Sequence, residues 1–217
     1  MFSPTDTVTF QRNEVAGSFD GIDYSSPGSG PTGLITITRN LFHDFVDNQS
    51  GSSIFGVFVT QTGGSSSITD NTMNNAGFAI LVDVARPVTI QHNILSNGLD
   101  GVAPSLVSSS MPTTISENSI FGNANLGIDL GSNGVTLNDT GDADTGPNDL
   151  QNFPVLTSVT NGGGMTTING RLNSAANTTY RIEFFGNTSI DPTGFGGIRH
   201  SAQFGSWGLH RDCAWEK

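Results

Sequence analysis

The feature that most constrains the fold is a repeat in the first 130 residues. Five segments share one pattern: a hydroxyl residue, an apolar residue, two polar residues, Asn, any residue and an apolar residue. They are residues 9–15, 36–42, 67–73, 89–95 and 114–120, and their asparagines are 27, 31, 22 and 25 residues apart. Each segment is followed by a second apolar piece that opens on Gly, which predicts two short strands per repeat. Such a unit cannot bury its own apolar side alone, but it can do so by stacking on its neighbours.

Stacking the five segments predicts an all-β fold, a parallel β-solenoid of about five turns. Two apolar columns would then form the core: Phe10, Ile37, Ile68, Ile90 and Ile115 in one, and Val15, Phe42, Met73, Leu95 and Ile120 in the other. The repeated asparagines would stack at a bend, because Asn tolerates the left-handed backbone and its amide can bond to the copies above and below. We interpret these asparagines as scaffold: Asn13, Asn40, Asn71, Asn93 and Asn118.

The pattern resembles the rungs of bacterial right-handed parallel β-helix repeat proteins, which read I-x-x-N-x-I followed by a G-I strand. Large secreted or surface-anchored proteins described as adhesin-like are especially similar. The likeness covers roughly residues 7 to 195 and includes residues 141–154, a segment that follows the last rung in such proteins. It implies an extracellular or cell-surface protein with a binding role, towards polysaccharide or another glycan. A glycoside hydrolase or polysaccharide lyase that uses the outer face of the same helix stays open, because this fold hosts enzymes and adhesins alike.

The chain divides into four parts on its periodicity. Residues 1–137 carry the repeat, and residues 138–152 are acidic and rich in Gly, which is typical of an ordered loop or linker. Residues 153–195 contain three alternating segments, 153–159, 166–172 and 179–185, which predict an antiparallel sheet that is smaller than a sandwich usually needs. Residues 196–217 hold both Trp residues, His200 and His210, and we expect an unstructured tail from a truncated or frame-shifted end.

Composition excludes several classes of protein. Eight basic residues face 19 acidic ones, for a net charge of −11, so no basic strip is available to bind nucleic acid. The single cysteine, Cys213, excludes a disulfide framework and a Cys-based zinc site. No apolar stretch approaches the ~18 residues of a membrane span. The first residues lack the charged and apolar regions of a signal peptide, so an export signal would lie outside this sequence.

The residues that precede the repeated asparagines form a candidate catalytic column. Its last three members are Asp70, His92 and Glu117, which would lie on consecutive turns ~4.8 Å apart. Two carboxylates flanking an imidazole could perform general acid/base chemistry on a glycan. A solvated ladder of opposite charges on an outer face explains the same residues. Asp23 and Asp129 would be about 19 Å apart, too far for glycoside hydrolysis, so we favour a protein without catalytic activity and leave the question open.

Four acidic side chains after the last repeat are candidate metal ligands. Asp139, Asp142, Asp144 and Asp149 offer the hard oxygen atoms that Ca²⁺ prefers. The spacing does not match an EF-hand, because Gly146 and Phe153 occupy positions where that motif needs ligands. Calcium binding and a plain solvated linker are both compatible with such a segment.

Two insertions, residues 43–55 and 103–113, interrupt the repeat and are rich in Ser, Asn and Pro. Solenoid insertions gather on one face, which is often the binding face. Phe42, His43, Phe45 and Phe55 lie in or beside the first insertion. Their rings could stack on sugars or pack into the core, and we favour the core because Phe is more often buried.

Overall fold

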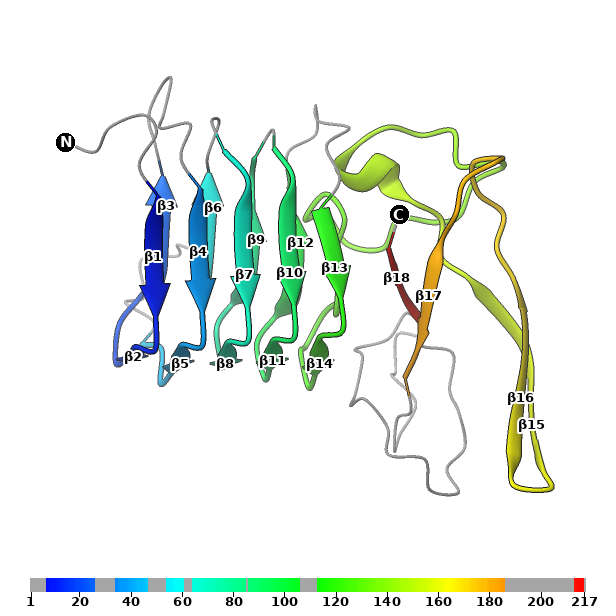
Figure 1. Cartoon of the computed structure of the whole chain (residues 1–217), viewed down its shortest axis with the longest axis horizontal. Coiled ribbons are helices and arrows are strands. Elements are labelled where there is room, and N and C mark those ends of the chain that lie inside the picture. Colours follow the sequence, from blue (N-terminus) through cyan, green and yellow to red (C-terminus); the bar gives the residue numbers. More distant parts are fainter. Residues whose placement is uncertain are drawn as a thin grey trace.

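The computed structural model shows a parallel β-solenoid followed by small antiparallel pieces (Figure 1). It describes residues 7–25, 34–46, 54–60, 64–84, 86–105 and 113–185, and the backbone of strand Cys213–Glu216. Predictions that concern residues 47–53, 106–112 and 196–212, including those for His200 and His210, lie outside the described residues. No helix formed by the described residues has the length and apolar character needed to cross a membrane.

Three parallel sheets form the sides of the solenoid. Sheet A contains β1 (Val8–Gln11), β4 (Ile35–Thr38), β7 (Ser66–Thr69), β10 (Val88–Gln91) and β13 (Thr113–Ser116). Sheet B contains β2 (Glu14–Ala16), β5 (Leu41–His43), β8 (Thr72–Asn74), β11 (Ile94–Ser96) and β14 (Ser119–Phe121). Sheet C contains β3 (Ile22–Ser25), β6 (Phe55–Thr60), β9 (Phe78–Val82) and β12 (Asp100–Pro104), and an isolated bridge between Val102 and Ile128 continues it.

The repeat therefore contains three strands rather than the two that the sequence predicts. Each conserved-length pattern segment divides at its Asn into a four-residue strand of sheet A and a three-residue strand of sheet B. The residue before the Asn has a positive φ, which turns the chain sharply within what looks like one apolar run. The prediction treated that run as a single strand because its apolar spacing is unbroken.

The core consists of the predicted apolar columns. Ile37, Ile68 and Ile90 of sheet A are fully buried, and so are their counterparts in sheet B, such as Phe42 and Leu95. Sheet C adds a third column: Ile22, Val57, Ile80 and Val102. Because parallel register places like residues above one another, each column stacks on itself along the solenoid axis.

The bend between sheets A and B corrects one prediction. The left-handed residue is not the Asn but the residue before it, with φ between 55° and 57° at all five positions: Arg12, Arg39, Asp70, His92 and Glu117. A left-handed backbone costs an ordinary residue roughly 1–2 kcal/mol. The stacked asparagines stabilise the same turn from the inside and offset this cost.

The asparagines form a continuous hydrogen-bonded ladder, as predicted. In the buried part, the backbone N–H and side-chain Nδ2 of Asn71 both donate to Oδ1 of Asn93, at 3.0 Å each. Asn93 donates in the same way to Asn118, at 2.9 and 3.0 Å. Each Nδ2 also donates to a carbonyl oxygen of the preceding rung, for example from Asn93 to Ile68 at 2.9 Å. The scaffold interpretation of the ladder follows from these bonds.

Glycine is required where the chain turns into sheet C. A Cβ atom on Gly56 would lie 2.5 Å from the carbonyl oxygen of Ala79 and 2.9 Å from the sulfur of Met73. At Gly21, it would lie 2.2 Å from the carbonyl oxygen of Gly56. The Gly that opens each second apolar piece therefore permits close approach of neighbouring rungs.

The segments after the solenoid differ from the predicted three-stranded sheet. Strands β15 (Val155–Gly162) and β16 (Met165–Arg171) form a two-stranded antiparallel hairpin, preceded by a short 3₁₀ helix (Pro147–Leu150). The third predicted strand, β17 (Arg181–Phe184), pairs instead with β18 (Cys213–Glu216), which lies within the expected unstructured tail. Strand β18 lies against β13 (Figure 1), and Phe185 is buried at that end of the core.

Candidate functional site

The predicted catalytic column lies at the outer edge of the bend between sheets A and B. Asp70, His92 and Glu117 each follow a strand of sheet A, and β7, β10 and β13 are consecutive neighbours in that sheet. All three side chains are exposed, because the left-handed turn directs them away from the core. The sequence therefore places them correctly on successive rungs.

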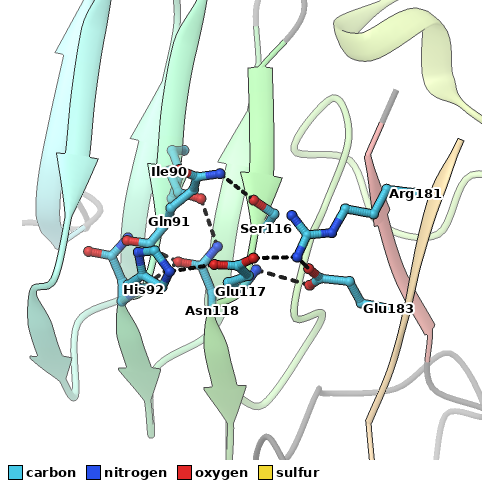
Figure 2. A network of polar contacts seen from close by, with 9 residues as sticks. Ile90, Gln91, His92, Ser116, Glu117, Asn118, Arg181 and Glu183 are labelled. Atoms are coloured by element: carbon cyan, nitrogen blue, oxygen red, sulfur yellow. Dashed lines mark hydrogen bonds and ion pairs between the residues drawn. The ribbon is translucent and has the colours of Figure 1, made fainter.

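The structure joins only two of these three residues. Nε2 of His92 contacts Oε2 of Glu117, whereas the Asp70 carboxylate makes no hydrogen bond or ion pair with any described residue. The other oxygen of Glu117 contacts Nη2 of Arg181 from strand β17. Figure 2 shows the Glu117 carboxylate between His92 and Arg181.

Glu183, also from β17, completes this network. Its Oε1 lies 2.8 Å from Nη2 of Arg181, and its Oε2 accepts a hydrogen bond of 2.9 Å from the backbone N–H of Glu117. The Glu183 side chain is only 13% exposed, against 41% for Glu117. The network therefore ties the last rung of the solenoid to the strand that packs beside it.

The electrostatics of this network oppose a role in proton donation. The hydrogen bond from Arg181, and then the one from His92, hold the pKa of Glu117 below the usual glutamate value. A general acid needs a raised pKa at neutral pH, so Glu117 is in the wrong charge state. Both of its oxygens are also engaged by neighbours. The arrangement serves attachment of β17 better than catalysis.

A second carboxylate, Asp129, has a structural environment. It is buried, and its two oxygens accept hydrogen bonds from the backbone N–H groups of Asn133 and Gly134 at 3.3 and 3.0 Å. Burial raises the pKa of Asp129. These contacts close the turn after the last bridge of sheet C, so this carboxylate does not face a substrate.

The acidic segment brings together three of the four predicted metal ligands. Ligand oxygens of Asp139, Asp142 and Asp144 all lie within 4.8 Å of one another, while Asp149 is not part of the group. Asp142 accepts hydrogen bonds from the Asn152 N–H at 2.6 Å and the Ser174 hydroxyl at 2.7 Å. These bonds fix one carboxylate of the cluster in place.

Asp144 is the least satisfied member of this cluster. Its Oδ1 is buried without a hydrogen-bond partner, and burial, followed by repulsion from Asp139 and Asp142, raises its pKa. Three converging oxygens with one unpartnered atom fit the donor set that a hard divalent cation such as Ca²⁺ uses.

The aromatic residues beside the first insertion have two different fates. Phe42 is fully buried and Phe45 is 8% exposed, so both belong to the core, as the favoured interpretation had it. His43 lies outside the core and contacts Oε1 of Glu14 at 3.0 Å and Oδ2 of Asp44 at 2.8 Å. The hydrogen bonds from these two carboxylates, that of Glu14 first, raise the pKa of His43.

Phe55 belongs to an aromatic platform on the outer face of sheet C, which we define as Phe55, Phe58 and Phe78. The Phe55 ring stacks on Phe58 with centroids 4.8 Å apart and on Phe78 with centroids 5.8 Å apart, at interplanar angles of 21° and 25°. All three side chains are partly exposed. Three stacked rings on a flat sheet form a surface on which a sugar ring can lie.

A family model described as right handed beta helix region matches residues 1–144 of the chain. The chain belongs to this right-handed β-helix family. The matched span contains all the strands of sheets A, B and C, so the family assignment and the observed solenoid agree. Comparisons with curated proteins and with solved structures gave no match.

Sequence reasoning missed several residues of this right-handed β-helix protein. Arg181 and Glu183 are more than sixty residues from Glu117, and no spacing rule connects β17 to the last rung. Phe58 and Phe78 carried a usable signal, because aligning the Gly residues of successive repeats places Phe55 beside Phe78 and Phe58 beside Leu81. The prediction aligned only the asparagines and so did not detect the platform.

Proposed function

We propose that this protein is a fragment of a bacterial extracellular or cell-surface β-helix protein with an adhesin-like role in binding carbohydrate. The observation that carries the proposal is the aromatic platform on sheet C. Isolated exposed rings are ordinary on protein surfaces, but three stacked and partly exposed rings create a continuous apolar area. Sugar rings present apolar C–H faces that pack on such rings, while their hydroxyl groups remain in water.

The candidate catalytic column supports binding over turnover. Glu117 is held in its charged form by Arg181 and His92, and Asp70 is not joined to them. Glycoside hydrolysis needs one carboxyl group that keeps its proton and a second one across the scissile bond. The column supplies neither arrangement.

The test is a glycan array probed with the purified chain, together with an assay for uronate release in the presence and absence of Ca²⁺. We expect retention of at least one glycan class and no release of product. Phe58→Ala removes one ring of the platform and should abolish retention. Phe184→Ala is the matched control, because this ring is 48% exposed on β17, away from the platform. Release of unsaturated or reducing sugar by wild type would instead establish an enzyme.

We also propose that Asp139, Asp142 and Asp144 bind Ca²⁺ and thereby order the segment after the last rung. The converging oxygens and the unpartnered Oδ1 of Asp144 support this. Calorimetric titration with Ca²⁺ should show one site that Asp144→Asn weakens and that Asp149→Asn leaves unchanged. Wild type that takes up no Ca²⁺, or equal effects of the two substitutions, would contradict the proposed ligand set.

A further inference from the structure

The outer face of sheet C combines aromatic rings with carboxylates and contains no basic side chain. The four strands of this sheet hold no Lys, Arg or His. Asp23 of β3 is in direct register with Phe58 of β6, which places the two residues on neighbouring strands ~4.8 Å apart. The platform therefore has an acidic neighbour on its own face.

The Asp23 carboxylate is available to a ligand. Its residue is exposed, and it makes no hydrogen bond or ion pair with any described residue. Asp20, on the same side of the platform, accepts a hydrogen bond of 3.0 Å from the backbone N–H of Phe55. This bond fixes a second carboxylate beside the rings. One charge is thus free to pair and the other is held in position.

A third carboxylate flanks the platform on the other side. Asp83 follows β9 and lies two residues beyond Leu81, the partner of Phe58 in the register. Since strand side chains alternate between faces, Asp83 shares the outward face with Leu81. Carboxylates on both sides, in a chain of net charge −11, give this face a negative potential.

This potential discriminates among sugars. The face of a phenylalanine ring attracts a cation, and a carboxylate forms a charge-assisted hydrogen bond with an ammonium group. A uronate would bring a further negative charge to a face that holds three carboxylates and no basic group. A neutral sugar would gain stacking alone. An amino sugar gains stacking, cation–π attraction and an ion pair together.

We infer that the aromatic platform and its carboxylates select glycans that carry free amino groups, such as polymers of glucosamine. This inference rests on the proposed carbohydrate-binding function and names the ligand class of the same surface. Asp23 supplies the principal contact to the ammonium group, and Phe58 supplies the ring on which that sugar lies.

The test compares three oligosaccharides of equal length: glucosamine oligomers, their N-acetylated counterparts and oligogalacturonate. Calorimetry at two salt concentrations measures each dissociation constant for wild type, Asp23→Asn, Asp70→Asn and Phe58→Ala. Asp70 is the matched control, since it is also an exposed, unpaired carboxylate but lies outside sheet C. Asp23→Asn should weaken binding of the glucosamine oligomer about fivefold, as expected for an exposed ion pair, and leave the acetylated oligomer unchanged.

The outcomes separate this inference from the function on which it rests. Equal or tighter binding of the acetylated oligomer or the uronate, abolished by Phe58→Ala, would overturn the amino-sugar selectivity and retain carbohydrate binding. Equal weakening by Asp23→Asn and Asp70→Asn would show that overall charge, rather than this surface, attracts the ligand, and would also overturn it. Binding of none of the three oligomers would overturn the selectivity, and failure on the glycan array as well would overturn the proposed function.

Discussion

Replacing Asn93 by Leu tests how far the asparagine ladder stabilises the solenoid. The side chain of Asn93 makes five hydrogen-bond contacts in the structure: two that it accepts from Asn71, and three that it donates to Ile68, Gln91 and Asn118. Leu has a similar volume, so the substitution removes these contacts without leaving a large cavity. The buried N–H of Asn71 then lacks its acceptor, and the Ile68 carbonyl loses a donor.

An unsatisfied buried polar group costs about 1–3 kcal/mol, so Asn93→Leu should lower the free energy of unfolding by about 2–5 kcal/mol. Asn13→Leu is the matched control in the same motif. Asn13 is exposed, and its side chain makes a single described bond, to Oδ1 of Asn40 at 3.0 Å. This variant should lose less than about 1 kcal/mol.

The assay is equilibrium unfolding in urea, with the free energy extrapolated linearly to zero denaturant. The slope of each transition must stay unchanged for the two free energies to be comparable. Equal losses for the two variants would refute the reasoning, because it assigns the difference to the number of buried bonds and not to the residue type.

Three further outcomes follow from the fold. Ile90→Asp should be far more destabilising than Gln91→Asp, by several kcal/mol against less than about 1, because Ile90 is fully buried and Gln91 faces outward; equal melting temperatures would show that the register is wrong. Asp70→Val should lower the melting temperature and Asp70→Gly should maintain or raise it, because Asp70 has φ 57° and only Gly adopts that conformation without strain; the reverse order would contradict the left-handed turn. The lowered pKa of Glu117 means that its stabilising ion pairs are present above the usual glutamate pKa and are lost as the pH falls through the lowered value. The melting temperature of wild type should therefore exceed that of Glu117→Gln at neutral pH and converge with it on acidification, and a constant difference would remove Glu117 from the network.

The architecture could be predicted because it is repeated. Ile37, Ile68 and Ile90 occupy the same place in three copies of one pattern, and parallel stacking converts that recurrence directly into a buried column. The asparagine ladder follows from the same periodicity. The identity of the left-handed residue did not follow, because Asp70 and His92 have no side-chain property in common that marks them for that conformation.

The candidate site was only partly predictable, since it depends on contacts between distant segments. His92 and Glu117 are one rung apart, so the repeat brings them together. Arg181 reaches Glu117 only because β17 leaves the expected antiparallel sheet and pairs with β18 beside the last rung. Nothing periodic connects residues 181–185 to the solenoid, and a local pattern of alternating residues cannot specify its partner strand.

Amide chemical-shift mapping of a bound glycan tests the central claim most directly. A glycan retained on the array would be titrated into the isotope-labelled chain, and the perturbed backbone amides would be assigned. The account predicts that the largest perturbations fall on sheet C, at Phe55, Phe58, Phe78 and Asp23. Perturbations centred on His92, Glu117 and Arg181, with sheet C unaffected, would contradict it and return the binding site to the bend between sheets A and B.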